Sequence, residues 1–260
     1  MRILIKIGSA LVSRERRFNY RWLSSKVREI AGIHREGHEI VIISSGAVAA
    51  GMEIEKLKER PKDVLKLQLL SGEGQIKLMK CYKDYFKKEG IIVAQVLLTH
   101  HNFDSPEEER TIKKIMNAYL RQRTIPIVNE NDLVNKEELE DKRVFTDNDI
   151  LAALVGITLD VNLAILLTDV EGLYHSDPKV NTLAELIERV EKIDDRIKTM
   201  ASKTANSLGL GGMHSKVRAA EMMTEGGIDV IMASGLKDLE KIIGNKIKRT
   251  FFKGRDRSRI

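Results

Sequence analysis

Polar and charged residues stand at the ends of five apolar segments of this sequence. They occupy positions 6–9, 44–46, 129–132, 168–169 and 233–235. If the apolar segments are strands of a parallel sheet, their carboxyl ends meet at one edge, which is where ligands bind in such folds. Each residue taken alone also has a structural explanation. Lys6 is explained as a charged residue that prevents pairing at an edge strand, Ser45 as a helix N-cap and Asp132 as a turn former. The recurrence of this residue class at successive segment ends instead favours a ligand site.

A glycine-rich segment, Gly209 to Lys216, has the chemistry of an anion site. Its glycines open a predicted helix, so free backbone N–H groups and the positive end of the helix dipole would face an anion such as phosphate. The segment is not a G-x-G-x-x-G fingerprint, because His214 stands where the third glycine should be, and it is not a Walker A loop. A helix C-cap followed by a second helix is the alternative interpretation. The acidic segment 145–149 also precedes a predicted helix, and helix capping is its alternative interpretation.

Apolar runs and helix-type periodicity alternate along the chain and would position these residues. Strands are predicted over residues 2–7, 39–43, 91–98, 125–128, 163–167 and 228–232. Helices are predicted over residues 20–35, over 64–86 with a break near Gly72 and Gly74, from Ser105 onward, and over 148–155, 183–190 and 215–225. The Val, Ile and Leu runs do not alternate with polar residues, which is typical of strands buried on both faces. The sequence therefore predicts an α/β fold with a mostly parallel central sheet and helices on both faces.

Composition excludes several classes of protein. The 260 residues are 42% hydrophobic and 32% charged, which indicates a globular chain with a full core. The single cysteine, Cys81, allows no internal disulfide, and no segment is apolar enough to span a bilayer, so we expect a cytoplasmic protein with no membrane partner. The net charge of +6 resides in residues 246–260, where Asp256 is the only acid among the basic residues. We therefore expect no nucleic-acid partner; RNA binding by this tail is the alternative, and it predicts an affinity that falls steeply with salt.

Six short motifs, in this order along the chain, resemble those of the amino acid kinase family. They are Ile5–Ser9, Ser44–Gly51, Val128–Asp132, Asp147–Asp149, Leu167–Tyr174 and Gly211–Lys216. The resemblance implies the family's α/β/α sandwich, with residues 1–260 forming a single kinase domain. It implies a substrate lobe over about 1–158, a nucleotide lobe over about 159–252 and a short basic tail over 253–260. The C-terminal RNA-binding-like domain of many members is not expected here.

Two of these motifs, residues 44–51 and 129–132, resemble those of members that phosphorylate the side-chain carboxylate of L-glutamate with ATP, the first step of proline biosynthesis. The resemblance implies roles by position. Lys6 and Lys216 would hold the transferring phosphoryl group, and Asp149 would fix the two lysines. Ser45, Asp132 and Asn148 would bind glutamate, with Asp147 supporting the substrate loop. ATP would be bound by Lys6, Thr168, Asp169, Leu210, Gly211, Gly212, Met213, His214, Ser215 and Lys216.

The chemistry agrees with these implied roles. The attacking group would be the carboxylate of the substrate, which has a pKa of about 4.3 and is ionised at neutral pH, so no general base is needed. Lysines, helix N-termini and Mg²⁺ would stabilise charge on the phosphoryl oxygens. We assign no protein metal ligand, because Mg²⁺ would be held mainly by phosphate oxygens and water. The resemblance also implies a homo-oligomer and a functional partner, glutamyl phosphate reductase, that consumes the acyl phosphate.

Three residues depart from the family pattern. Leu210 and His214 stand where small or hydroxyl-bearing residues usually contact ATP, and Glu73 stands where a small apolar residue is usual in the substrate wall or subunit contacts. Two alternative functions therefore stay open: a sibling kinase that acts on acetylglutamate, aspartate or a nucleotide, and a catalytically silent amino-acid sensor. The presence of both lysines and of residues 147–149 argues against the sensor.

Overall fold

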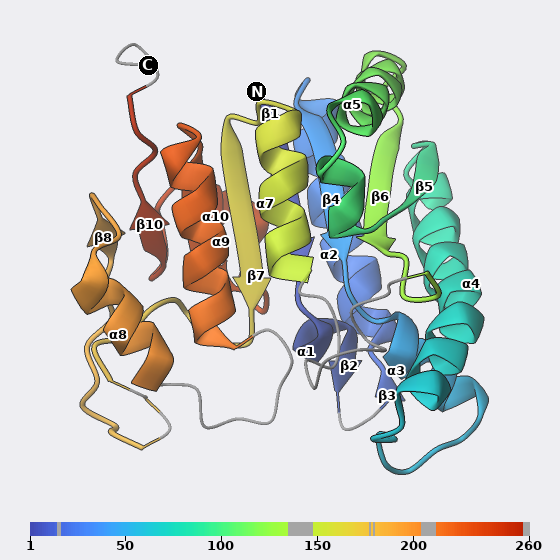
Figure 1. The fold of residues 1–260 in the computed structure, drawn as a ribbon, viewed down its shortest axis with the longest axis horizontal. Helices are drawn as coiled ribbons and strands as arrows, with labels where there is room; N and C mark the ends of the chain where they lie inside the picture. The colour runs from blue at the N-terminus through green and yellow to red at the C-terminus, as the bar shows by residue number, and fades with distance from the viewer. Residues whose placement is uncertain (15–16, 135–147, 177, 179, 204–211, 257–260) are drawn as a thin grey trace.

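An eight-stranded sheet runs through the molecule (Figure 1). The computed structural model describes all residues except 15–16, 135–147, 177, 179, 204–211 and 257–260. In spatial order the strands are β5 (Val93–Leu98), β6 (Ile125–Glu130), β4 (Glu39–Ser44), β1 (Arg2–Ile7), β7 (Leu163–Thr168), β9 (Asp229–Ser234), β10 (Thr250–Phe252) and β8 (Arg189–Val190). The strands from β5 to β9 are parallel, and β10 is antiparallel to β9. The predicted mostly parallel sheet is confirmed, and its carboxyl ends share one edge.

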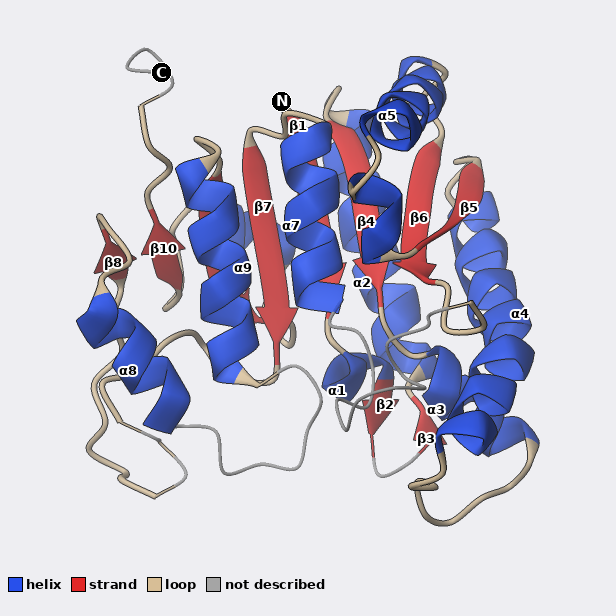
Figure 2. Cartoon of the chain, viewed as in Figure 1, coloured by secondary structure: helices blue, strands red, loops and turns tan. Residues whose placement is uncertain are grey.

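Helices cover both faces of this sheet (Figure 2). They are α1 (Ser9–Val12), α2 (Tyr20–Arg35), α3 (Ala47–Ile54), α4 (Val64–Lys88), the 3-10 helix η1 (His100–Phe103), α5 (Pro106–Arg121), α7 (Asn148–Thr158), α8 (Asp195–Lys203), α9 (Met213–Glu225) and α10 (Leu239–Ile243), with a hairpin of β2 (Ser13–Arg14) and β3 (Arg17–Phe18). Helices α2, α4 and α10 pack on one face, and α5, α7 and α9 pack on the other. On β1, Ile3 and Ile5 belong to the first core and Leu4 to the second, as the two-residue period of a strand requires.

The predicted break in α4 at Gly72 and Gly74 is wrong, because the helix is continuous over 25 residues. Gly74 is instead needed where α4 crosses α3: a Cβ there would lie 1.8 Å from the carbonyl oxygen of Ala47. Gly51 of α3 meets α4 as closely, with a Cβ position 2.0 Å from the carbonyl oxygen of Leu70. Close backbone contact therefore explains these glycines. Despite the length of α4, the described residues include no helix that is long and apolar enough to cross a bilayer.

The helix predicted over residues 183–190 is also wrong. This segment is extended: the backbone N–H of Ile187 donates to the carbonyl of Leu173, and Leu186 forms an isolated bridge with Tyr174. It ends in β8, which pairs with β10 at the edge of the sheet. Leu183, which the helical pattern would have buried, is 86% exposed. The backbone partners of this segment lie elsewhere in the chain, so its local pattern was misleading.

Candidate active site

Three charged side chains that lie far apart in the sequence meet at the carboxyl edge of the sheet. Lys6 is near the end of β1, Asp149 is the second residue of α7, and Lys216 is in the first turn of α9. The Nζ of Lys6 forms an ion pair with Oδ1 of Asp149, and the Nζ of Lys216 lies 3.2 Å from Oδ2 of the same carboxylate. The Asp149 side chain is fully buried, and those of the lysines are at most 10% exposed. We call these three residues the lysine cluster.

The lysine cluster combines one carboxylate with two ammonium groups. Burial alone would raise the pKa of Asp149, but the ammonium groups of Lys6 and Lys216 outweigh this effect and hold the pKa below its ordinary value. The carboxylate is therefore ionised at neutral pH and lies between two ammonium groups. Because the ammonium groups are buried, each interacts strongly with a nearby anion. The arrangement suits a phosphoryl group that carries several negative oxygens.

The sequence places each member of the lysine cluster for a local reason. Alternation along β1 turns Lys6 toward the same side as Leu4, which is the side covered by α7 and α9. Asp149 lies in the first turn of α7, where the positive end of the helix dipole stabilises an acid. The capping role considered for this acidic segment is thus replaced, for Asp149, by ion pairs to the lysines.

A chain of hydrogen-bonded side chains begins one residue before Asp149. The Nδ2 of Asn148 donates to Oγ of Ser45 and to Oδ1 of Asn129, both at 3.1 Å. The Nδ2 of Asn129 in turn donates to Oε1 of Gln75, at 2.8 Å. Ser45 and Asn148, which the resemblance assigned to one substrate, are therefore in direct contact. We call these four residues the amide chain.

The turn after β4 requires glycine. Gly46 precedes α3 with φ of 117°, in the left-handed region that favours glycine. A Cβ on Gly46 would also lie 2.6 Å from Cγ2 of Val12. The backbone N–H of Ser45 donates to the carbonyl oxygen of Ile7, which ties the turn to the end of β1. The Ser45 hydroxyl is thereby held next to the strand that carries Lys6.

Asp132 forms a second polar group near the end of β6. It is buried, its Oδ2 accepts a hydrogen bond from Oγ of Ser71, and its carbonyl oxygen accepts one from Nε2 of Gln68 at 3.0 Å. Burial raises the pKa of Asp132, and the Ser71 hydroxyl and the positive charge of Arg60 oppose this in part. Side chains of α4 therefore form hydrogen bonds both with Asp132 and with Asn129 of the amide chain.

The sequence reasoning missed the polar residues of α4. Gln68, Ser71 and Gln75 have the spacing of neighbours on one helix face, and each contacts Asp132 or Asn129. Their signal was polar residues inside an otherwise apolar, buried stripe that includes Leu67, Leu70 and Leu78. Asn129 lay in a motif that was recognised, but it was not singled out.

The predicted nucleotide residues lie at the ends of β7 and the start of α9. Thr168 is buried, its Oγ1 donates to Oδ1 of Asp169 at 3.1 Å, and Asp169 is exposed. Gly212 is the N-cap of α9 and has no side chain to bond the helix N–H groups. Next to it, the buried Oγ of Ser215 has no hydrogen-bond partner among the described residues. This edge therefore offers unused donors to an anion.

The remaining predicted residues have mixed positions. Met213 packs against the second core and His214 is exposed. Asp147, Leu210 and Gly211 lie outside the described residues. Glu73, one of the three departures, is exposed on α4, while Gln75 of the same segment is buried. The acid at position 73 therefore does not face the amide chain.

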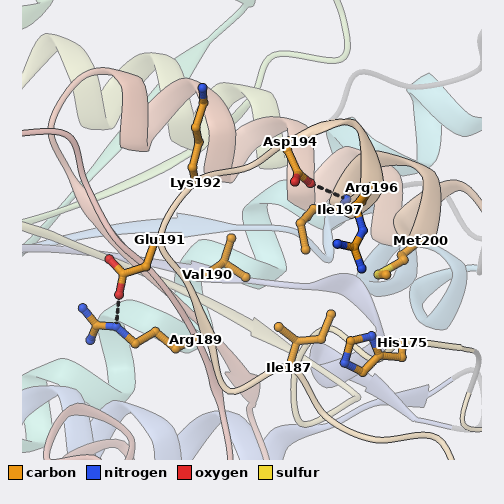
Figure 3. Close-up of a pocket in the computed structure, with 10 residues that line it drawn as sticks. All are labelled: His175, Ile187, Arg189, Val190, Glu191, Lys192, Asp194, Arg196, Ile197 and Met200. Atoms are coloured by element: carbon orange, nitrogen blue, oxygen red, sulfur yellow. Dashed lines mark hydrogen bonds and ion pairs between the residues drawn. The ribbon is translucent and has the colours of Figure 1, made fainter.

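A pocket of about 290 Å³ lies apart from the lysine cluster, between β8 and α8 (Figure 3). Its lining consists of His175, Ile187, Arg189, Val190, Glu191, Lys192, Asp194, Arg196, Ile197 and Met200. Arg189 pairs with Glu191 at its rim, as Figure 3 shows. None of the predicted site residues lines this pocket.

Comparison with known proteins assigns the chain to a family. The model of the amino acid kinase family matches residues 1–234. The chain belongs to the amino acid kinase family. Among its relatives in the amino acid kinase family, a glutamate 5-kinase from Clostridium acetobutylicum is 39% identical over 237 residues, covering 91% of this chain and 87% of the relative. A glutamate 5-kinase from Proteus mirabilis is 37% identical over 255 residues, covering 97% of this chain and 68% of the relative.

The amino acid kinase fold is also seen in the solved structures that this chain resembles. Carbamate kinase from Giardia lamblia, bound to AMP-PNP, matches with a TM-score of 0.67 over 98% of each chain. The sequence identity is 14%, so this likeness concerns the fold alone. It agrees with the α/β/α architecture expected from the sequence.

Proposed function

We propose that this chain transfers the γ-phosphoryl group of ATP to the side-chain carboxylate of L-glutamate, giving L-glutamyl 5-phosphate in the first step of proline biosynthesis. The observation that carries the proposal is the buried lysine cluster, in which one carboxylate holds two lysines at the carboxyl edge of the sheet. The glutamate 5-kinase relatives supply the identity of the acceptor.

Lys6 and Lys216 bind the phosphoryl group in this proposal, and Asp149 positions them. Phosphoryl transfer needs the two reacting oxygens held in line and the charge on the phosphoryl oxygens neutralised. The lysines approach from β1 and α9, on separate elements of the fold. Asp149 fixes both ammonium groups before substrate arrives, which lowers the cost of reorganisation in the transition state.

Glutamate is bound by Ser45, Asn148 and Asp132, with Asp147 supporting the substrate loop. The hydroxyl and amide groups of the amide chain suit a carboxylate, and the Asp132 carboxylate suits an ammonium group. An amino acid that carries both groups matches this donor and acceptor set. Its side-chain carboxylate is already ionised at neutral pH and needs no base to attack phosphorus.

ATP is bound by Lys6, Thr168 and Asp169 together with residues 210–216. The start of α9 supports this. Among the described residues no side chain caps its first N–H groups and none bonds the buried Ser215 hydroxyl, so these groups suit phosphate oxygens. Mg²⁺ bound with the nucleotide would supply further positive charge to the phosphate oxygens. We propose that this cation is held mainly by phosphate oxygens and water. In the part of the chain that the structure describes, no three His, Cys, Asp or Glu side chains group as metal ligands.

The wider setting follows from the same proposal. In this proposal the chain consists of a substrate lobe over about residues 1–158 and a nucleotide lobe over about residues 159–252. The acyl phosphate product is reactive, so a glutamyl phosphate reductase acts next. We also propose a homo-oligomer in the cytoplasm, and light scattering of the purified chain tests the assembly.

The proposed function is tested by trapping the acyl phosphate with hydroxylamine. Purified chain with ATP and Mg²⁺ is given glutamate, aspartate, N-acetylglutamate or UMP, and ADP release is followed in parallel. Hydroxamate from glutamate alone is the expected result. ADP release with another acceptor assigns the chain to a sibling kinase, and no turnover with any acceptor favours the amino-acid sensor.

A further inference from the structure

The buried polar face of α4 contacts both parts of the proposed glutamate site. Ser71 and Gln75 lie one turn apart on α4 and are both at most 8% exposed. Ser71 donates to Asp132, and Gln75 accepts from Asn129. We propose that Ser71 and Gln75 are positioning residues that set the hydrogen-bonding polarity of the site, making Asp132 an acceptor for an ammonium group and Ser45 a donor for a carboxylate. This inference rests on the proposed function and deepens it.

The polarity of the amide chain begins at Gln75. The Oε1 of Gln75 is an acceptor only, so Asn129 has to turn its Nδ2 toward it. Asn129 then presents Oδ1 to Asn148, whose Nδ2 also reaches Oγ of Ser45. Because Oγ of Ser45 accepts this bond, the Ser45 hydroxyl proton has to donate elsewhere. None of the described residues accepts that proton, and the carboxylate of a bound amino acid is a suitable acceptor.

Ser71 fixes the opposite polarity at Asp132. Its hydroxyl donates to Oδ2, which favours the ionised form of the carboxyl group. The Oδ1 of Asp132 receives no hydrogen bond from a described residue and is left for the ammonium group of the substrate. Gln68, one turn before Ser71 on α4, donates to the backbone carbonyl of Asp132, whereas Ser71 donates to its side chain.

A purely structural role for Gln75 does not explain its unpaired nitrogen. The Nε2 of Gln75 is buried and has no hydrogen-bond partner among the described residues, which costs free energy of folding. A residue chosen only for packing beside Leu78 would be apolar. The retained amide is explained if its oxygen is needed to orient Asn129.

The experiment compares matched substitutions in the full chain. Ser71→Ala and Gln75→Met remove the polar contacts. Ser71→Thr keeps the hydroxyl, and Gln75→Glu keeps an acceptor for Asn129 in nearly the same shape. Asp84→Asn, at a partly exposed position of the same helix, is the control. For each variant, kcat, the KM for glutamate and the KM for ATP are measured by hydroxamate formation, and Tm is recorded.

Ser71→Ala loses a hydrogen bond to a charged carboxylate, so the KM for glutamate should rise about tenfold or more, and Gln75→Met loses a bond between neutral amides, so the KM should rise about fivefold. In both variants we expect kcat and the KM for ATP within about twofold of wild type. Ser71→Thr and Gln75→Glu should stay within about threefold of the wild-type KM, even if the second buried oxygen of Glu lowers Tm.

Two results overturn the inference. One is an unchanged KM for glutamate in both Ser71→Ala and Gln75→Met. The other is a Gln75→Glu variant as impaired as Gln75→Met, which would show that the acceptor at position 75 does not orient the chain. If Gln75→Met does not fold, Ser71→Ala and Gln75→Glu decide. Failure of the proposed function is distinct, because it appears as a wild-type chain that forms no product from glutamate.

Discussion

The Nζ of Lys216 lies 3.2 Å from Oδ2 of Asp149, on the opposite carboxylate oxygen from the one that pairs with Lys6. A single buried acid therefore fixes two cations that come from opposite ends of the chain. In the proposed reaction these cations bind the transferring group, and the acid keeps them in place before ATP arrives.

Asp149→Asn should remove this restraint with little change in shape. Two buried ammonium groups would lose the negative charge of Asp149, and breaking a buried ion pair from one side costs about 3–5 kcal/mol. We expect that loss in the free energy of unfolding, measured by denaturant titration, and a fall in kcat on the order of 10². Asp84→Asn is the control, because Asp84 is 47% exposed and pairs with Lys80 on the surface. Wild-type activity in Asp149→Asn would show that Asp149 does not organise the lysines.

The stability provided by Asp149 should depend on pH in a defined direction. Its folded-state pKa is below the ordinary value of 3.8, so its contribution is fully present above that value and is lost as pH falls through the folded-state pKa. The stability difference between wild type and Asp149→Asn should therefore shrink as pH falls below about 4. Urea titrations between about pH 3 and pH 7 measure it. A difference that grows in acid would contradict the sign of the pKa shift.

Lys216→Ala should impair the chemical step more than substrate binding. In the proposed reaction its ammonium group binds the phosphoryl group, so kcat should fall by a factor on the order of 10² or more, with a smaller effect on the KM for glutamate. Lys198→Ala, on neighbouring α8, is the matched control, because Lys198 is 44% exposed and pairs with Glu221. A kcat near that of wild type would mean that the role of Lys216 is misassigned.

Asp132 should make glutamate binding sensitive to acid. Burial raises its pKa, against the Ser71 hydroxyl and the charge of Arg60, so it protonates at a higher pH than an exposed aspartate. Ammonium binding needs the ionised form, so as pH falls from neutrality the KM for glutamate should begin to rise at a higher pH than it would with an exposed aspartate. Asp132→Ala should have a raised KM that changes little over the same fall in pH. An unchanged KM in Asp132→Ala would remove Asp132 from the glutamate site.

Two glycines of α4 should respond oppositely to the same substitution. At Gly74 a Cβ would lie 1.8 Å from the backbone of Ala47, so Gly74→Ala should force α3 and α4 apart and destabilise the fold by about 1–3 kcal/mol or more. At Gly72 the nearest atom is a Leu133 methyl at 3.5 Å, and Gly72→Ala should be neutral or stabilise by up to about 1 kcal/mol. Thermal unfolding of the two variants distinguishes these outcomes. Equal effects would contradict the tight α3–α4 crossing.

The sequence predicted the strand ends and the helix starts at this edge of the sheet better than the contacts between their side chains. Lys6 and Ser45 end apolar runs that are indeed adjacent parallel strands, and Asp149 begins the predicted helix. Strand order brings these ends together, and no spacing along the chain encodes that order. The pairing of Lys216 with Asp149 depends on the packing of α9 against α7, which sequence spacing does not encode. It was therefore expected from the family resemblance alone.

Errors arose where the deciding partner is distant in the sequence. Gly72 and Gly74 suggested a break in α4, but the need for Gly74 comes from the backbone of Ala47 on α3. Residues 183–190 have a helical pattern, yet Leu173 and β10 draw them into extended structure. Gln75 was not singled out because its partner, Asn129, lies at the end of β6.

The most direct test of the central claim follows the oxygen of the attacking carboxylate. Glutamate labelled with oxygen-18 in its side-chain carboxyl group is incubated with the chain, ATP, Mg²⁺ and hydroxylamine, and the released phosphate is analysed by mass spectrometry. Attack of that carboxylate on the γ-phosphorus, followed by hydroxylamine attack on the acyl carbon, leaves one oxygen-18 atom in each phosphate. We predict phosphate labelled in this way, in amounts equal to the hydroxamate. Unlabelled phosphate would mean that water, and not glutamate, accepts the phosphoryl group, and would contradict the assignment of Ser45, Asp132 and Asn148 to the acceptor site.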